Sequence, residues 1–471
     1  MATVKKTLVL YPSLGVGHLN PMVEVAKAIL RHGLGVLIAI VDAPDTDAVS
    51  AAAVARLSAA NPAIDFRLLP LPAPAPAPAS PEVHPVRRSL DTLRLANPAL
   101  RDLLRSLRPA RLALLLDMFC VDALDVAAEL GVPAYFFFAS AASDLAVFLD
   151  LPYYYPTVPS FGDMAKDTLV RCCPGMPPIR AVDMLKTVQD KESEATKVRL
   201  YQFRRMAEGR GVLVNSFDWL EPAALEALRG AGAGSGAGRP TPAVYCIGPL
   251  VNGGGKSAES GERHECLAWL DEQPKRSVVF LCFGSKGAFS SPQLREIARG
   301  LERSGHRFLW AVRSPPEEQS LFPEPELERL LPAGFLERTR SNGMVLKNWA
   351  PQPEVVRHEA VAAFVTHCGW NSTLEAIMSG LPMICWPLYA EQSMNKVFMV
   401  EEMKIAVEME GYDEFVKAEE VQAKVRLVMD TEEGRMLRER LVVAKEKALE
   451  AIKEDGSSQA AFAEFLKDFR G

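Results

Sequence analysis

The sequence predicts an α/β protein with two doubly wound domains, each built around a parallel sheet that helices cover. Short apolar runs alternate with stretches of helical periodicity along the chain, which is the pattern of consecutive βαβ units. The 471 residues are more than one ordinary hydrophobic core holds, so two domains of roughly 200 residues each are expected. A Gly/Ala-rich segment at 229–239, RGAGAGSGAGR, has the composition of a linker between them.

The expected elements follow this alternation in order. Strands are expected at 7–11, 36–41, 65–69, 112–117, 134–138 and 211–215, and again at 277–283, 307–312, 343–347, 360–366 and 383–386. The first helix is expected at 20–31, because Pro21 would then stand in the first turn, where its missing N–H costs nothing. The Ala-Pro stretch at 71–81 is expected to be a surface loop, and charged amphipathic helices are expected at 418–470.

Charge and cysteine content exclude several classes of function. The formal net charge of −6 gives no basic field that would attract a nucleic acid. The 8 cysteines include no C-x-x-C pair and mostly lie in apolar runs, which is typical of reduced thiols in the cytosol. No signal peptide is recognisable, and no uninterrupted apolar stretch reaches the ~20 residues of a membrane helix. We therefore expect a cytoplasmic monomer that binds small molecules, with no nucleic acid and no membrane span.

The segment 367–372, HCGWNS, follows a strand-like run and precedes a helical run. A strand, a glycine-containing turn and a helix start bring backbone N–H groups and the positive end of the helix dipole to one point, as a diphosphate requires. His367, Asn371 and Ser372 can add side-chain donors there. Taken alone, the segment could equally be a buried turn.

Residues near this segment have the chemistry that a nucleoside requires. Glu375 falls one turn into the expected helix, where a carboxylate can accept from two ribose hydroxyls but would repel phosphate. Trp349 offers a flat face on which a base can stack, an interaction of about 1–3 kcal/mol. The small-residue turn at 284–287 would let backbone approach a ligand closely, although such a turn by itself is a weak signal.

A second candidate site lies early in the chain. The stretch 11–21, YPSLGVGHLNP, predicts a strand, a glycine-rich loop and a helix start, but it lacks the third glycine of the dinucleotide fingerprint. His18 stands in this loop, where a lone histidine is more often structural than catalytic. Asp117 ends the apolar run 112–116, where an aspartate mostly caps a turn.

The uninterrupted 44 residues from Trp349 to Gln392 resemble the signature box of plant secondary-product glycosyltransferases, so the chain is similar to the flavonoid O-glucosyltransferases among the plant family 1 UDP-glycosyltransferases. The resemblance implies a GT-B fold, in which two doubly wound Rossmann-like domains face a central cleft. It implies an N-terminal acceptor-binding domain at 1–245 and a C-terminal UDP-sugar-binding domain at 246–452 that carries the box at 349–392. A C-terminal helix at 453–471 is expected to pack back on the N-terminal domain.

The resemblance also assigns roles in donor binding. In the family the residue matching Trp349 stacks on uracil and the one matching Gln352 reaches the nucleoside. Those matching Glu391 and Gln392 bind the sugar hydroxyls; many members carry Asp in place of Glu391, and a terminal Gln is usual for glucose users. The donor-binding set so implied is Ser285, Trp349, Ala350, Gln352, His367, Gly369, Trp370, Asn371, Ser372, Glu375, Tyr389, Glu391 and Gln392.

By the same resemblance, the chemistry belongs to the early loop. His18 matches the family's catalytic base and Asp117 its partner carboxylate, which would hold the useful imidazole tautomer. The expected reaction is one inverting displacement, in which a phenolic oxygen attacks the sugar of UDP-glucose. UDP-glucose is a substrate here, and neither a cofactor nor a metal is expected, since no D-x-D motif near the expected cleft and no His/Cys cluster with metal spacing is found.

The acceptor pocket is expected to draw largely on the N-terminal half. Its proposed residues are Gly15, Phe119, Phe138, Phe148, Met184 and Ala390. For each aromatic residue singly, core packing is as good an interpretation. Relatives often have a Thr that touches the donor sugar in the segment matching 138–140; Ala139 cannot do this, so either Ser140 does or the contact is absent.

Alternatives stay open at this point. The chain could make C-glycosides, or use UDP-galactose, UDP-xylose or a glucuronyl donor. It could also be a UDP-sugar-binding protein without turnover, but an inactive relative would most easily lose His18 and Asp117, which are both present. A hydrolase or dehydrogenase is excluded for want of a nucleophile elbow or a dinucleotide fingerprint.

Overall fold

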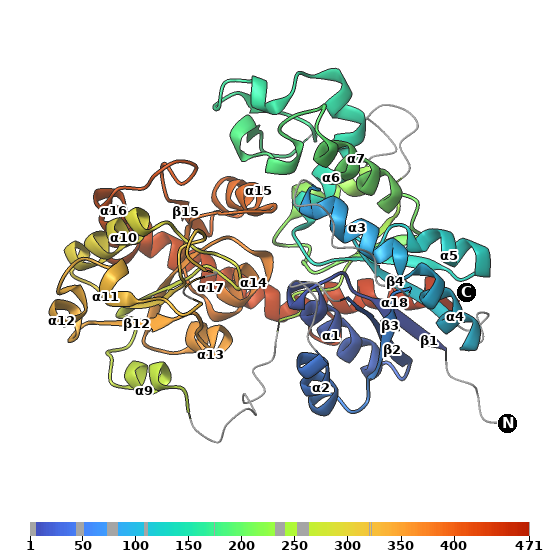
Figure 1. The fold of residues 1–471 in the computed structure, drawn as a ribbon, viewed down its shortest axis with the longest axis horizontal. Helices are drawn as coiled ribbons and strands as arrows, with labels where there is room; N and C mark the ends of the chain where they lie inside the picture. The colour runs from blue at the N-terminus through green and yellow to red at the C-terminus, as the bar shows by residue number, and fades with distance from the viewer. Residues whose placement is uncertain are drawn as a thin grey trace. The chain divides into compact units, whose positions relative to one another are not determined.

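The structure is a computed structural model that describes residues 6–43, 51–72, 83–107, 112–173, 175–230, 241–251, 263–319, 321 and 323–470 (Figure 1). Nearly all of the expected linker at 229–239 and most of the Ala-Pro stretch at 71–81 lie outside the described residues. The chain divides into two compact units. The N-terminal unit comprises Met1–Ala181, Lys186–Val251 and Ala451–Gly471, and the C-terminal unit comprises Val182–Leu185 and Asn252–Glu450.

The N-terminal unit is built on a parallel sheet with the strand order β3-β2-β1-β4-β5-β8-β9. Its strands are β1 (Thr7–Tyr11), β2 (Gly35–Asp42), β3 (Asp65–Pro70), β4 (Leu112–Asp117), β5 (Ala134–Phe138), β8 (Gly211–Val214) and β9 (Ala243–Cys246). The order reverses between β1 and β4, since the chain continues from β1 to β2 on one side and from β4 to β5 on the other. Ligands of open α/β sheets bind at the carboxyl ends of such a strand pair.

Helices flank this sheet. They are α1 (Val16–Arg31), α2 (Ala51–Ala60), α3 (Pro85–Leu95), α4 (Asn97–Ser106), α5 (Ala123–Leu130), α6 (Ala142–Tyr154), α7 (Glu194–Met206), α8 (Pro222–Gly230) and α18 (Ser457–Arg470). A small antiparallel pair, β6 (Leu169–Val170) and β7 (Ile179–Arg180), lies between α6 and α7 in the chain.

The first helix begins earlier than the sequence predicted. α1 starts at Val16 rather than at residue 20, because Gly15 has a φ of 91°, which glycine adopts readily, and its carbonyl accepts the His18 N–H at 3.3 Å. The expectation that Pro21 stands in the first turn is therefore wrong. Pro21 lies inside the helix, where it removes one helical hydrogen bond. His18 consequently lies in the first turn of α1 and not in a loop.

The last helix, α18, packs against the sheet of the N-terminal unit. Phe465 is fully buried and meets the ring of Tyr135 edge-on, with 5.0 Å between centroids, and the ring of Tyr245 at 5.8 Å. Tyr135 donates a hydrogen bond of 2.5 Å to Asp468, and Arg210 pairs with the same carboxylate at 2.6 Å. Apolar and charged contacts thus fix the helix to β5 and β9.

The C-terminal unit has a parallel sheet with the order β12-β11-β10-β13-β14-β15. Its strands are β10 (Val278–Cys282), β11 (Arg307–Val312), β12 (Gly343–Lys347), β13 (Val361–Thr366), β14 (Met383–Cys385) and β15 (Ala406–Glu408). Its helices are α9 (Glu265–Asp271), α10 (Ser291–Ser304), α11 (Leu327–Leu330), α12 (Phe335–Thr339), α13 (Gln352–Arg357), α14 (Trp370–Ser379), α15 (Gln392–Val397), α16 (Ala418–Asp430) and α17 (Glu432–Ala451). Here the strand order reverses between β10 and β13.

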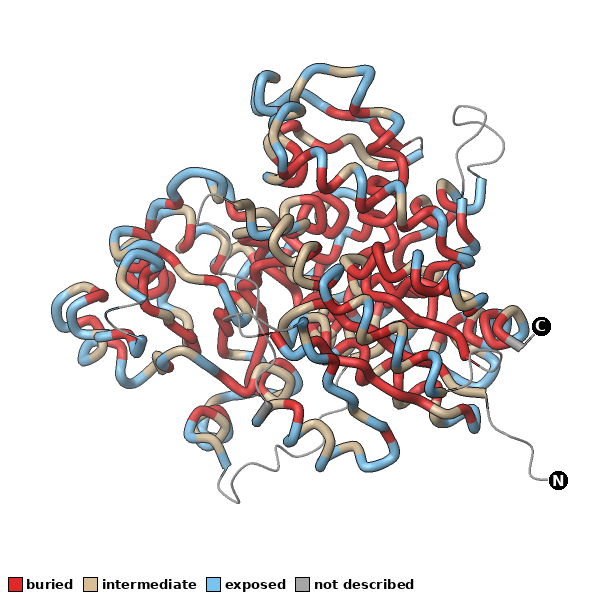
Figure 2. Tube along the Cα trace, turned by 45° about the vertical axis from the view of Figure 1, so that its right-hand side comes forward, coloured by how far each residue is buried: buried red, intermediate tan, exposed pale blue. Residues whose placement is uncertain are grey.

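Two parallel sheets flanked by helices confirm the doubly wound α/β prediction. β4 and β13 are buried at every position, which explains why both appear in the sequence as continuous apolar runs. Figure 2 shows buried residues in red and exposed residues in pale blue along the chain. None of the helices in the described ranges is long and apolar enough to cross a membrane.

We expect Phe465→Ala to lower the free energy of unfolding by about 3–5 kcal/mol, because it removes a fully buried ring from the contact between α18 and the sheet. Lys467→Ala on the same helix is the control, since Lys467 is exposed, and it should change this free energy by less than about 0.5 kcal/mol. Urea denaturation followed by circular dichroism measures both. Equal midpoints for the two variants would contradict the packing described.

Candidate active site

His18 and Asp117 meet where the strand order of the N-terminal sheet reverses. His18 follows β1, and Asp117 is the last residue of the neighbouring β4. The Nδ1 atom of His18 lies 2.9 Å from Oδ2 of Asp117. The aspartate side chain is only 2% exposed, whereas the imidazole is 34% exposed. The structure thus brings the two predicted residues together, with the carboxylate buried behind a ring that solvent and ligands can reach.

Backbone contacts hold the carboxylate in this orientation. Asp117 Oδ1 accepts the N–H of Phe119 at 3.1 Å, and the Asp117 carbonyl accepts the N–H of Cys120 at 2.8 Å. With Oδ1 held in this way, Oδ2 faces the imidazole. When Nδ1 carries the proton that it donates to Asp117, Nε2 of His18 has the lone pair and can accept a proton.

Phe119 and Arg199 lie beside this pair. The Phe119 ring meets His18 edge-on, with 5.3 Å between ring centroids. The guanidinium of Arg199, which comes from α7 and is 8% exposed, lies over the Phe119 ring at 4.9 Å and donates to Gln202 at 2.9 Å. Sequence analysis missed Arg199, because nothing in the sequence distinguishes it from the other basic residues of an amphipathic helix.

The other N-terminal predictions fall in different surroundings. Phe138 and Phe148 are almost completely buried and meet edge-on at 5.8 Å, and Phe148 stacks on Phe203 at 4.3 Å. Ser140 is buried, and its hydroxyl donates to Asp144 at 2.8 Å. The two phenylalanines therefore belong to the packed interior of the N-terminal unit. Their part in an acceptor pocket, and the sugar contact of Ser140, stay predictions.

In the C-terminal unit, His367 follows β13. Its ring packs against the backbone of Gly284, in the turn after β10, and of Gly369. A Cβ atom added to Gly284 would lie 2.6 Å from Nε2 of His367, and one added to Gly369 would lie 2.5 Å from it. Both positions must therefore lack a side chain for the ring to fit. Burial lowers the pKa of His367 to about 4, so the imidazole is neutral at physiological pH. Its buried Nδ1 has no hydrogen-bond partner in the described part of the chain.

The start of α14 lies beside this histidine. The first-turn N–H groups of Asn371 and Ser372 have no partner inside the helix, as at every helix start. Gln352 donates to Ser372 Oγ at 2.9 Å and to Glu375 Oε2 at 2.8 Å. Because the Ser372 oxygen accepts from Gln352, its own hydroxyl hydrogen can donate to a ligand. Burial raises the pKa of Glu375, and the bond from Gln352 opposes that shift.

Trp349 is exposed, unlike two other residues of the predicted donor-binding set. Its side chain is 56% exposed and meets the ring of His264 edge-on at 5.5 Å, whereas Ala350 and Trp370 are buried. Ser285, in the turn after β10, is exposed as well. Trp349 thus presents an indole that a planar ring can stack on.

The last residues of the signature box form a loop before α15, and the side chain of Gln392 holds this loop in place. The side-chain oxygen of Gln392 accepts the N–H groups of Leu388 and Tyr389, both at 2.9 Å. The Gln392 oxygen is thus committed to this loop, and the predicted sugar contact would use its NH2 group. Glu391 occupies the N-cap position of α15 without a side-chain capping hydrogen bond, and Ala390 is exposed with a left-handed φ of 56°. Met184 is buried in the short segment Val182–Leu185 that belongs to the C-terminal unit.

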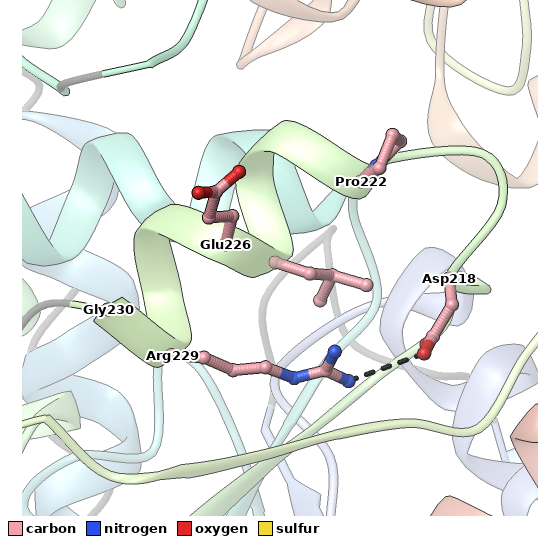
Figure 3. Close-up of a pocket in the computed structure, with 6 residues that line it drawn as sticks. Asp218, Pro222, Glu226, Arg229 and Gly230 are labelled. Carbon is pink, nitrogen blue, oxygen red and sulfur yellow. Dashed lines mark hydrogen bonds and ion pairs between the residues drawn. The ribbon is translucent and has the colours of Figure 1, made fainter.

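The predicted site residues form neither a metal cluster nor part of the pocket drawn in Figure 3. No group of three or more His, Cys, Asp or Glu side chains that could hold a metal occurs within the ranges described. The pocket in Figure 3 is lined by Asp218, Pro222, Leu225, Glu226, Arg229 and Gly230. It contains none of the predicted site residues, and an ion pair of 3.4 Å joins Arg229 to Asp218 there.

Comparison with known proteins places the chain among sugar transferases. Residues 245–435 match the family model "UDP-glucoronosyl and UDP-glucosyl transferase". The chain is 43% identical over 480 residues to an anthocyanidin 5,3-O-glucosyltransferase from a Rosa hybrid cultivar, with 98% of each chain covered. It is 40% identical over 481 residues to a phloretin 2'-O-glucosyltransferase from Malus domestica, again with 98% of each covered.

A solved structure extends the likeness to the whole fold. A UDP-glucosyltransferase from Polygonum tinctorium capable of glucosylating indoxyl superposes with a TM-score of 0.88 at 35% identity, and all of both chains is covered. The alignments with these relatives span nearly the full length of this chain and of each relative. The chain therefore belongs to the UDP-glycosyltransferase family: it is a glycosyltransferase, and its two doubly wound units are the two domains of a GT-B fold.

Proposed function

We propose that this enzyme is an inverting UDP-glucose-dependent O-glucosyltransferase that transfers glucose to a phenolic hydroxyl of a flavonoid or a similar plant small molecule. The observation that carries the proposal is the 2.9 Å contact between His18 Nδ1 and Asp117 Oδ2. The relatives support the substrate class, because one is named for an anthocyanidin and another for phloretin.

The proposed chemistry begins with the acceptor. A phenol such as that of tyrosine titrates near ~10, so at neutral pH its oxygen becomes a better nucleophile if a base takes the proton. His18 would accept that proton at Nε2 while Asp117 stabilises the imidazolium from the other side of the ring. The acceptor oxygen then forms a bond to the anomeric carbon as the bond from that carbon to UDP breaks. One such displacement converts an α-linked donor into a β-glucoside.

The leaving UDP acquires negative charge, and the C-terminal unit offers fixed dipoles for it. Backbone N–H groups at the start of α14 and the hydroxyl of Ser372 would donate to the phosphates. His367 would act there as a neutral hydrogen-bonding group, because burial keeps it uncharged. Glu375, bonded to Gln352, would hold the ribose one turn further along the helix, and Trp349 would stack on the uracil.

The compartment proposed is the cytosol. All eight cysteines are free and buried. Burial raises the pKa of Cys172 and of Cys173 to about 12, so both thiols stay protonated and unreactive. A protein with this many reduced thiols suits a reducing compartment.

UDP-glucose should be the preferred donor, because Gln392 ends the box and its NH2 group can bind a sugar hydroxyl. We expect the highest kcat/KM with UDP-glucose when UDP-glucose, UDP-galactose, UDP-xylose and UDP-glucuronate are compared with one phenolic acceptor by mass spectrometry. Equal or better turnover with any of the other three would refute the glucose assignment. A product that resists acid hydrolysis would instead indicate C-glucosylation.

Trp349→Ala should weaken the binding of UDP by about 1–3 kcal/mol, because the uracil loses its stacking surface. Trp269→Ala is the matched control, since Trp269 lies on α9 of the same unit and is not among the proposed donor contacts. Isothermal titration of UDP into the wild-type protein and both variants measures the effect. An unchanged affinity of Trp349→Ala would show that the indole does not contact the base.

His18→Ala should lower kcat by about 10²–10⁴-fold while UDP affinity stays at the wild-type value, because only general-base catalysis is lost. Asp117→Asn should also lose activity, since an amide favours the wrong tautomer. Raising the pH toward the ionisation of the phenol should partly rescue His18→Ala, because a phenolate needs no base.

The matched control for His18 is His306→Ala, which breaks another histidine–aspartate pair, to Asp430 at 3.0 Å in the C-terminal unit. It should leave kcat unchanged. The proposal fails if His18→Ala glucosylates a neutral phenol near pH 7 at the wild-type rate. A wild-type protein that binds UDP but turns over none of the phenols would refute the phenolic acceptor class.

A further inference from the structure

We propose that Asn395 is a positioning residue for the phosphate-binding backbone of the donor site, an inference that rests on the proposed function. Asn395 lies on α15, beyond the signature box, and is completely buried. Its side-chain Nδ2 donates to the carbonyl of Cys368 at 3.0 Å. Cys368 lies between His367 and Gly369, in the turn that leads into α14. The bond therefore joins α15 to the turn that we assign to the diphosphate.

The bond from Asn395 fixes the orientation of the peptide group between Cys368 and Gly369. The Cys368 carbonyl and the Gly369 N–H belong to one planar trans peptide, so they point in opposite directions. A bond that holds the carbonyl toward Asn395 therefore directs the Gly369 N–H away from α15. None of the described residues accepts a hydrogen bond from that N–H. It precedes the first-turn N–H groups of α14, so Asn395 adds one oriented donor to them.

The turn needs such a contact because its backbone conformation is unusual. Cys368 has a φ of 65°, in the left-handed region that residues other than glycine rarely adopt. Within the turn, the Cys368 N–H bonds to Thr366 Oγ1 at 3.3 Å. Asn395 acts from outside the turn on the carbonyl of the same residue. A weaker hold on this carbonyl would let the peptide rotate, and the Gly369 N–H would turn with it.

The surroundings of Asn395 indicate that its amide is present for this bond and not for packing. Its Oδ1 atom is buried without a hydrogen-bond partner among the described residues. A buried polar atom without a partner destabilises a fold, so an apolar residue of similar size would pack at lower cost. The neighbouring Lys396 is buried and pairs with Asp183 at 2.9 Å and Glu408 at 3.2 Å. α15 is thus anchored, and Asn395 can impose its position on the turn.

The test compares UDP with uridine, which lacks the phosphates. In Asn395→Ala the affinity for UDP should fall about five- to ten-fold, the loss expected for one hydrogen bond in the site. The affinity for uridine should stay within about two-fold of wild type, since its proposed contacts, Trp349 and Glu375, are unchanged. Ligand-observed NMR titration measures both. A merely structural role would move both affinities together.

Asn215→Ala is the matched control, because Asn215 is also completely buried and donates to the Leu250 carbonyl at 3.1 Å in the N-terminal unit. It should leave both affinities at the wild-type values. If Asn395→Ala does not fold, Asn395→Ser is tested in its place, and its loss of affinity for UDP is compared with its loss of affinity for uridine. Equal weakening of UDP and uridine, or wild-type affinity for UDP, would overturn this inference alone. A wild-type protein that fails to bind UDP would overturn the proposed function and this inference with it.

Discussion

The reversal of strand order in each parallel sheet is the constraint on which both candidate sites depend. At β1 and β4 it places the first turn of α1 beside the last residue of β4, and His18 meets Asp117 there. At β10 and β13 it places the turn with Gly284 beside the turn with His367. In doubly wound sheets the helices leave such a strand pair toward opposite faces, so the backbone between them stays open to a ligand. The same topology thus positions the proposed proton-accepting site in one unit and the proposed diphosphate site in the other.

The two sites use burial in opposite ways. In the N-terminal unit a buried carboxylate lies behind an imidazole that is 34% exposed, which suits a ring that gains and loses a proton. In the C-terminal unit the imidazole of His367 is buried and its pKa is lowered to about 4, so it stays neutral. A neutral ring beside a helix start supplies oriented dipoles and not a full charge. Such dipoles need no reorganisation when charge develops on a leaving diphosphate.

Much of this arrangement could be predicted from the sequence. The parts that could not be predicted depend on backbone conformation or on contacts between residues far apart in the chain. The strands β4 and β13 are apolar throughout because both faces are buried, so local composition identified them. The pairing of His18 with Asp117 came from a resemblance, since 99 residues separate them and no local pattern connects them. The start of α1 was placed wrongly, because the backbone conformation of Gly15 decided it and not the position of Pro21. Local sequence shows composition and period, but not which distant atoms meet.

The turn between β13 and α14 shows how such distant contacts decide residue identity. Gly284 and Gly369 must be glycines because a Cβ at either would collide with His367. Cys368 has a left-handed backbone but is not glycine, and its side chain is completely buried. A thiol is small enough for that interior and retains the apolar contacts that glycine would lose. The conformational cost of roughly 1–2 kcal/mol is then opposed by this burial and by the bond from Asn395. The core behind the turn thus determines the residue at position 368. The ring of His367 determines that positions 284 and 369 are glycines.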